Sequence, residues 1–322
     1  MNQPLTHAQD ALPKPILPAW VFDHQTPDCL EGAAFSSGAA LSLLHVLLSG
    51  PNSAVPVDLL RNRLALRAAV HGCKIEGRGV TEAELRDAYL LTVPGDAMGP
   101  DGDMLAFWRA GTAISLGHRR SLPETGWHER LQALLLEDMQ VLLPDWIARA
   151  EEAGANPIAK SVLVLTNIVQ SFPRQEAVAL LCADIILARS FGWARPLPLF
   201  GLYVSRKALR AVTNGEDVRI ACHNAVTRAA QDAIRLAHDL ARRAAHLRAV
   251  APKLRTKGSQ DAVRLFLSED AVLPSTMLSP VIRGSNIPMT PRSARRLCVR
   301  LIELGVVREL TGRATFRLYG VA

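Results

Sequence analysis

The chain has 322 residues, of which 49% are hydrophobic and 21% are charged, and its formal net charge at pH 7 is +7. This length suffices for two domains, or for one large helical domain with a small module, and the apolar content excludes an intrinsically disordered chain. Aromatic residues make up only 5%, while alanine, leucine and arginine are abundant, so the composition favours helices over sheets.

The first 25 residues are rich in proline and polar side chains, and we expect residues 1–25 to be partly extended. They lack the basic region followed by an apolar core that marks a secretory signal. Five widely spaced cysteines without a C-x-x-C pair argue against a disulfide framework or a thiolate zinc site. We therefore expect a cytoplasmic protein whose cysteines are buried free thiols.

Residues 26–250 are expected to form a body of several helices. An uncharged run at 32–50 is nearly long enough to span a bilayer. Because it contains serines, glycines and His45 and lacks basic flanks, we interpret it as a buried core helix and expect no membrane partner. Further along the chain, Thr81 and Glu84 have the T-x-x-E spacing of a capping box at a helix start.

The middle of the body is its most apolar part. Asn156 followed by Pro157 predicts the start of one helix, and Gly192 is a suitable end for the next. Residues 217–250 are expected to form a long helix rich in alanine and arginine, with an apolar stripe at spacings of three and four. Other helical segments are expected at 104–114, 127–143 and 144–154.

The positive charge is concentrated after the body. Residues 1–250 carry 25 basic and 25 acidic side chains, whereas residues 251–322 carry 12 basic and 5 acidic ones. A surface of this kind attracts polyanions such as nucleic acid. A solvated basic face is the alternative, but it does not explain why the first 250 residues are balanced. We interpret residues 251–258 as a basic hinge and residues 259–322 as a separate module.

The best-marked helix of this module lies at 291–304. Thr290 is a suitable N-cap, Pro291 suits the first helical position, and Gly305 suits the position after the last turn. Helical spacing places one group of side chains on an inner face: Ala294, Leu297, Cys298, Leu301 and Ile302. The opposite face and its flanks then carry Arg292, Arg295, Arg296, Val299, Arg300 and Glu303.

The elements around this helix suggest a known type of module. Residues 259–270 fit an amphipathic helix, and a shorter helix is expected within 274–284. Strands at 306–310 and 315–319 are expected to form a hairpin with Arg313 at its tip. In the second strand, one face is expected to carry Phe316 and Leu318 and the other Thr315, Arg317 and Tyr319. The order is similar to a winged helix-turn-helix, so the predicted fold class is mainly α, a multi-helix body with a small C-terminal winged helix-turn-helix that has a two-stranded wing.

In such a module an arginine-faced helix can enter the major groove of DNA, where arginine reaches guanine O6 and N7 or phosphates. An arginine in the wing contacts the backbone or the minor groove. The candidate nucleic-acid-binding residues are therefore Arg292, Arg295, Arg296, Arg300 and Arg313. The predicted function is DNA binding, with double-stranded DNA as the partner, in a regulatory role. The body would then form a homodimer or sense a ligand.

Two other classes of function stay open. Winged helices also bind proteins, so the chain is alternatively an adaptor. An enzyme with an unrecognised pocket in the body is a weaker alternative, because the sequence contains no Gly-rich phosphate loop, no H-E-x-x-H and no G-x-S-x-G. His238 and His246 lie eight residues apart without a third metal ligand. We therefore expect no catalytic activity, no cofactor and no metal.

The chain also resembles a bacterial family of unknown function, domain-of-unknown-function family 1403. The segments that carry the resemblance are "AAFSSGAALSLLHVLL", "RNRLALRAA", "ELRDAYLLTVPGDAMGP", "FGWARPLPL" and the ending "RRLCVRLIELGVVRELTGRATFRLYG". They extend over nearly the whole chain. The resemblance implies one unit with a helical body, and it implies no activity.

Overall fold

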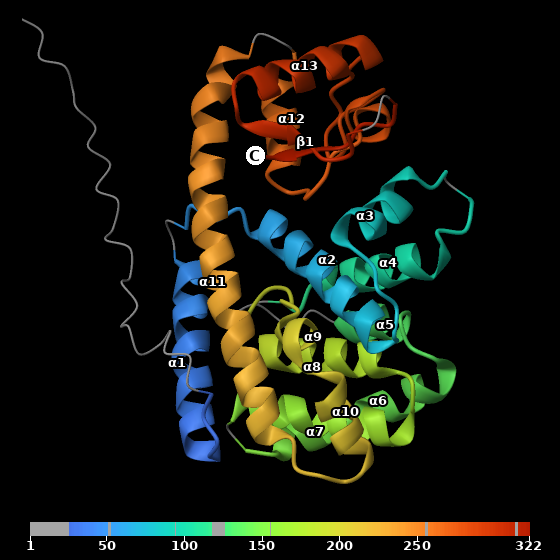
Figure 1. The fold of residues 1–322 in the computed structure, drawn as a ribbon, viewed down its shortest axis with the longest axis vertical. Coiled ribbons are helices and arrows are strands. Elements are labelled where there is room, and N and C mark those ends of the chain that lie inside the picture. Colours follow the sequence, from blue (N-terminus) through green and yellow to red (C-terminus); the bar gives the residue numbers. More distant parts are fainter. Residues whose placement is uncertain are drawn as a thin grey trace, which may run out of the picture.

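The computed structural model describes residues 26–50, 53–93, 95–117, 126–154, 156–254, 257–312 and 315–322. Within these ranges the chain is mainly helical, as predicted, and its one regular sheet is a two-stranded antiparallel pair near the C-terminus. Figure 1 shows that α11 (Arg219–Val250) runs along one side of the molecule and connects the lower helices with the C-terminal elements at the top.

The helices of the body are α1 (Leu30–Ser49), α2 (Val57–Ile75), α3 (Glu82–Leu91), α4 (Gly99–Ala113), α5 (Trp127–Gln132), α6 (Glu137–Glu152), α7 (Pro157–Ser171), α8 (Glu176–Phe191), α9 (Leu199–Tyr203), α10 (Arg206–Thr213) and α11. The predicted helix ends agree with several of these. Thr81 and Glu84 form the expected capping box at α3. The side chain of Asn156 accepts two backbone N–H groups at the start of α7, and Gly192 ends α8 with a φ of 67°.

The expected break at Pro144 is wrong. The chain turns between α5 and α6, and α6 continues through the proline. A proline inside a helix removes one backbone N–H and usually ends or kinks it. Here the buried positions Leu143, Trp146 and Ile147 keep helical spacing next to the proline, and we attribute the persistence of α6 to their burial.

Helix α1 lies alongside α11 (Figure 1). It was expected to be a buried core helix, but it buries only one side, because α11 covers only that side. Phe35, on the other side, is 65% exposed. Within the ranges above, α1 is the one helix long and apolar enough to cross a bilayer. Of the five cysteines, Cys29 is exposed and caps α1 through its sulfur, while the other four are buried.

The core is richest around α8, where burial extends to nearly every side of the helix. The carboxylate of Asp184 is completely buried there and accepts the N–H groups of Phe200 at 2.7 Å and of Gly201 at 3.1 Å, at the start of α9. Burial raises the pKa of Asp184 well above its ordinary value, and these backbone hydrogen bonds oppose the shift. The expected stripe of α11 is confirmed, since all its members are buried: Val226, Ala230, Ala233, Ala237, Leu240, Ala244 and Leu247.

The remaining elements are η2 (Ala251–Lys253), α12 (Ser259–Phe266), η3 (Pro274–Leu278), α13 (Pro291–Glu303), β1 (Val307–Glu309) and β2 (Tyr319–Val321). We call residues 259–322 the C-terminal module. The predicted hinge at 251–258 begins as η2, a 3₁₀ turn that continues directly from α11. Residues 255–256 of that hinge lie outside the described residues.

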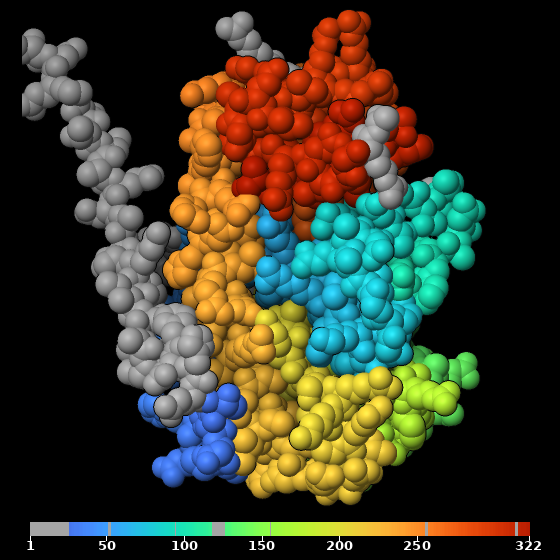
Figure 2. Space-filling view, viewed as in Figure 1, coloured from blue at the N-terminus to red at the C-terminus, as the bar shows by residue number. Residues whose placement is uncertain are grey.

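A largely buried cluster of charges joins the C-terminal module to the body. The guanidinium of Arg109 on α4 contacts the carboxylates of Asp270 and, at 3.1 Å, Glu269. Arg86 on α3 lies 4.0 Å from Asp270. Hydrogen bonds from α2 also reach the module, since Asn62 donates to the carbonyl of Ser268. In the space-filling view the C-terminal module, in red, lies directly against residues of α3 and α4, in cyan (Figure 2). The division into two folding units stays a prediction.

Candidate nucleic-acid interface

Helix α13 forms where the sequence predicts it. The Thr290 hydroxyl accepts the N–H of Ser293 at 3.2 Å, Pro291 occupies the first turn, and Gly305 follows the last turn with a φ of 68°. Glycine adopts this left-handed conformation without the steric cost that a side chain brings. The N-cap and the glycine end therefore define the helix that carries most candidate arginines.

The inner face of α13 is confirmed except at one position. Ala294, Leu297, Cys298 and Leu301 are buried, whereas Ile302 is 39% exposed. At 3.6 residues per turn, Ile302 lies about 90° from the centre of the buried stripe, so it lies at the edge of the packed face. The assignment of Ile302 to the inner face is therefore wrong.

Replacing Leu301 by alanine is expected to lower the free energy of unfolding by about 2–5 kcal/mol, because Leu301 is completely buried and alanine would leave a cavity. Chemical denaturation of the full chain measures this. Ile302→Ala on the same turn is the control, and because Ile302 is partly exposed we expect a smaller loss. Equal losses for the two variants would contradict the assigned face.

The arginines of α13 all lie on the exposed side of the helix. Arg300 contacts Glu303 at 2.9 Å, and the Nε of Arg295 donates to the carbonyl of Pro291 at 3.3 Å. Among the described residues no ion pair holds Arg292 or Arg296. The last candidate, Arg313, lies outside the described residues. The structure thus brings four of the five candidates together along one helix.

The C-terminal hairpin forms with a different second strand. Strands β1 and β2 pair Val307 with Val321 and Glu309 with Tyr319. The second strand thus begins at residue 319 and not at 315. Phe316 has a φ of 54°, which interrupts the extended alternation on which the prediction rested.

The expected faces of this strand are consequently wrong. Leu318 is completely buried, but Phe316, predicted on the same face, is 67% exposed. Tyr319, predicted on the opposite face, is buried as well. Arg317 is exposed and contacts Glu309 at 3.4 Å.

A further strand pairing, which the sequence did not indicate, extends this hairpin. Val272 and Tyr319 exchange two backbone hydrogen bonds of 2.7 and 3.0 Å. The backbone of Asp270 comes so close to the hairpin that a Cβ at Gly320 would lie 2.9 Å from its carbonyl oxygen. The hairpin is therefore anchored to the segment that also carries the buried charge cluster.

The acidic side chains of the C-terminal module leave much of its basic surface uncompensated. Glu269 and Asp270 pair with the body through Arg109. The other three each contact a neighbouring arginine of the module: Asp261 with Arg264, Glu303 with Arg300, and Glu309 with Arg317. Two of the five carboxylates are therefore directed to the body. On α13 itself, Glu303 is the one acidic residue that opposes the positive charge of the outer face.

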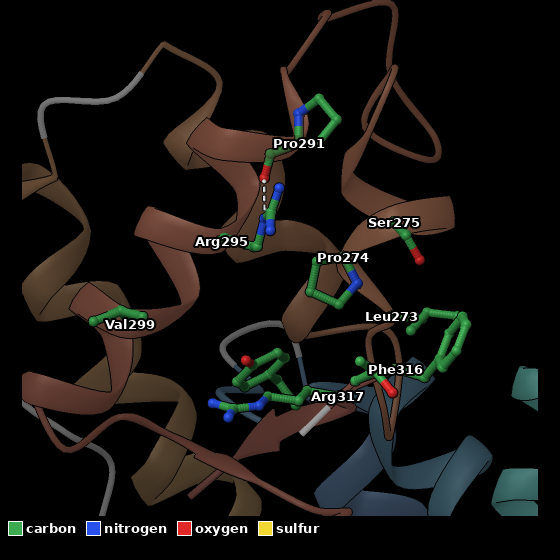
Figure 3. Close-up of a pocket in the computed structure, with 10 residues that line it drawn as sticks. Leu273, Pro274, Ser275, Pro291, Arg295, Val299, Phe316 and Arg317 are labelled. Carbon is green, nitrogen blue, oxygen red and sulfur yellow. Dashed lines mark hydrogen bonds between the residues drawn. The ribbon is translucent and has the colours of Figure 1, made fainter. Parts of the chain in front are cut away.

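A pocket of about 470 Å³ lies between α13, η3 and the hairpin (Figure 3). Figure 3 shows that Arg295 and Val299 reach it from α13, and Phe316 and Arg317 from the hairpin. Its lining is completed by Leu273, Pro274, Ser275, Pro291, Thr315 and Tyr319. Sequence reasoning missed this pocket, because its walls come from three segments that meet only in the folded chain.

A family model described as a protein of unknown function, DUF1403, matches residues 5–321, which is nearly the whole chain. No match to a curated protein was found. Within the described residues, no group of three or more His, Cys, Asp or Glu side chains could hold a metal ion.

Proposed function

Because this chain belongs to the DUF1403 family, whose description assigns no activity, we propose a function from its own geometry: it binds double-stranded DNA through α13. The observation that carries the proposal is the exposed arginine face of this helix, on which no ion pair from the described residues holds Arg292 or Arg296. Exposed arginines on one helix face can reach guanine edges and phosphates in the major groove. We propose a cytoplasmic regulatory protein whose body forms a homodimer or senses a ligand.

The order of elements in the C-terminal module supports a winged helix-turn-helix. Helix α12 is followed by the Val272 pairing, then η3, α13 and the hairpin. In this interpretation α13 is the recognition helix and the segment between β1 and β2 is the wing. Val272 forms an isolated bridge with Tyr319 through two backbone hydrogen bonds, in the position that a third strand of a wing sheet would occupy. The module differs from a winged helix-turn-helix at η3, which is a single turn of five residues in the position of the second helix.

The arginines are expected to divide by role. Arg292 and Arg296 lie one turn apart on the outer face, so we propose that they approach base edges. Arg295 and Arg300 lie on the flanks and are assigned to phosphates, together with Arg313 in the wing. Glu303 on the same side repels phosphate but can accept from cytosine N4, which would favour some sequences over others.

Binding of the full chain to a library of duplexes, at low and at physiological salt, tests the proposal. We expect Arg292→Ala or Arg296→Ala to cost about 1–3 kcal/mol, mainly at one base pair, if the arginine contacts guanine. A variant that loses a phosphate contact should weaken all sequences alike and lower the salt slope by about one. Arg210→Ala is the matched control, because Arg210 is exposed on α10 at the other end of the molecule (Figure 1).

Absence of duplex binding at low salt would overturn the proposal. Strong binding that ignores sequence would reduce α13 to an electrostatic anchor. An effect of Arg210→Ala as large as that of Arg296→Ala would show that binding does not depend on α13.

An adaptor function is the second candidate, and one observation favours it. Val299 and Ile302 are large apolar residues that lie exposed on α13. Exposed apolar side chains on a helix are typical of a protein contact. If duplex binding is absent, these two side chains are the first to replace in a search for a protein partner.

A further inference from the structure

The pocket between α13 and the hairpin has a distinct chemistry. Among the described residues that line it, the charged ones are Arg295 and Arg317, and both are cationic. The rest of its walls is mostly apolar and includes Pro274, Val299 and the ring of Phe316. A volume of about 470 Å³ falls within the range of about 300–1,000 Å³ that small-molecule pockets occupy. The lining thus suits an anion that carries a flat apolar group.

Phe316 is held in this pocket at a conformational cost. A left-handed backbone, here with a φ of 54°, is uncommon for residues other than glycine, asparagine and aspartate and is unfavourable for a bulky one. Phe316 is also 67% exposed, so burial of its side chain does not offset that cost. Strained residues of this kind cluster at ligand sites. An exposed aromatic side chain in a pocket that two arginines also line can stack on a nucleobase while the arginines attract its phosphate.

The position of Arg295 connects the pocket with the proposed DNA surface. This residue lines the pocket and belongs to the same exposed helix face as Arg292 and Arg296. Its Nε is held by the carbonyl of Pro291, and among the described residues nothing accepts from its terminal nitrogens. A DNA strand that crosses α13 can therefore continue into the pocket without leaving the basic surface.

We propose that the pocket receives one unpaired nucleotide of the DNA that α13 binds. The inference rests on the proposed function. The base lies against Phe316 and Pro274, and the phosphate lies at Arg295 and Arg317. A base in an intact duplex is held in the stack and cannot enter such a pocket. The protein therefore prefers DNA with a bulged or extruded nucleotide over a fully paired duplex.

The test compares a matched duplex with the same duplex carrying one bulged 2-aminopurine, using the full chain. We expect the bulged duplex to bind about 5- to 150-fold more tightly, which is the affinity that stacking of one base on an aromatic side chain contributes. Phe316→Ala and Phe316→Leu should both remove this preference and the change in 2-aminopurine fluorescence. Phe35→Ala is the control, because Phe35 has nearly the same exposure but lies on α1.

The matched and the bulged duplex together distinguish DNA binding through α13 from nucleotide binding in the pocket. Binding of the matched duplex without a preference for the bulge, or a preference that survives both Phe316 variants, would overturn the pocket assignment and leave the proposed function standing. Absence of binding to both DNAs would overturn both. An acidic peptide with aromatic residues serves as a third probe. If Phe316→Ala weakens binding of this peptide but does not change binding of DNA, the pocket is a protein site.

Discussion

Replacing Asp270 by alanine is expected to lower the free energy of unfolding of the full chain by about 3–5 kcal/mol. The substitution leaves the largely buried guanidinium of Arg109 with Glu269 as its one carboxylate partner among the described residues, and it removes the carboxylate that lies 4.0 Å from Arg86. Burial by itself lowers the pKa of Arg109, but the carboxylates of Asp270 and Glu269 hold it above its ordinary value. Without Asp270 the arginine stays charged in a poorly solvated position, which is the costly state. Chemical denaturation followed by circular dichroism measures the loss.

The control for this prediction removes both charges. Arg109→Leu combined with Asp270→Leu should cost less than the sum of the two single substitutions, because no uncompensated charge remains.

The same experiment bears on the predicted hinge at 251–258. If Asp270→Ala shifts one cooperative transition, the body and the C-terminal module unfold together. A separate early transition of the module, or a loss below about 1 kcal/mol, would contradict a role for this cluster in joining them.

Replacing Asp184 by alanine is expected to cost about 2–6 kcal/mol. The carboxylate accepts the N–H groups of Phe200 and Gly201 in a completely buried position, and each donor left without a partner there costs about 1–3 kcal/mol. Asp184→Asn should cost less than Asp184→Ala, because the amide keeps one carbonyl acceptor. Equal losses in the two variants would show that these hydrogen bonds do not determine the effect. Thermal and denaturant unfolding at constant pH give both values.

The dependence on pH distinguishes the two Asp184 variants from the wild type. Because burial raises the pKa of Asp184 in the folded chain, the folded state holds this proton more tightly than the unfolded state does. The contribution of Asp184 to stability is therefore greatest at low pH and declines as pH rises above about 4, the ordinary aspartate value. The decline continues until the pH reaches the raised pKa of Asp184 in the folded chain. The stability of the wild type relative to Asp184→Asn should fall over that range, and a relative rise would show that the carboxylate is favoured in the charged form.

Local signals in the sequence were sufficient for much of the secondary structure. Thr81, Asn156, Thr290 and Gly305 mark helix ends through hydrogen bonds or backbone conformations that involve only near neighbours in the chain. The inner face of α13 followed from helical spacing, because a helix that packs on one side needs its apolar residues in one stripe along that side. Ile302 was the exception, since spacing does not show how wide the packed face is.

Where side chains from distant segments meet, only the tertiary structure decided the outcome. Pro144 stays inside α6, which we attribute to the burial of its apolar face, and Phe316 leaves the expected strand through a positive φ. The pairing of Val272 with Tyr319 joins residues 47 positions apart, and the contact of Arg109 with Asp270 joins residues 161 positions apart.

The charge excess of residues 251–322 and the arginines of α13 could be counted in the sequence. The sequence thus determined which side chains are available for an interface. It could not determine that two of the five carboxylates turn inward to the body, or that Arg295 and Phe316 line one pocket. The reason is physical, because the position of a charge or a ring relative to another depends on how the elements pack, and packing depends on contacts between segments that no local pattern encodes.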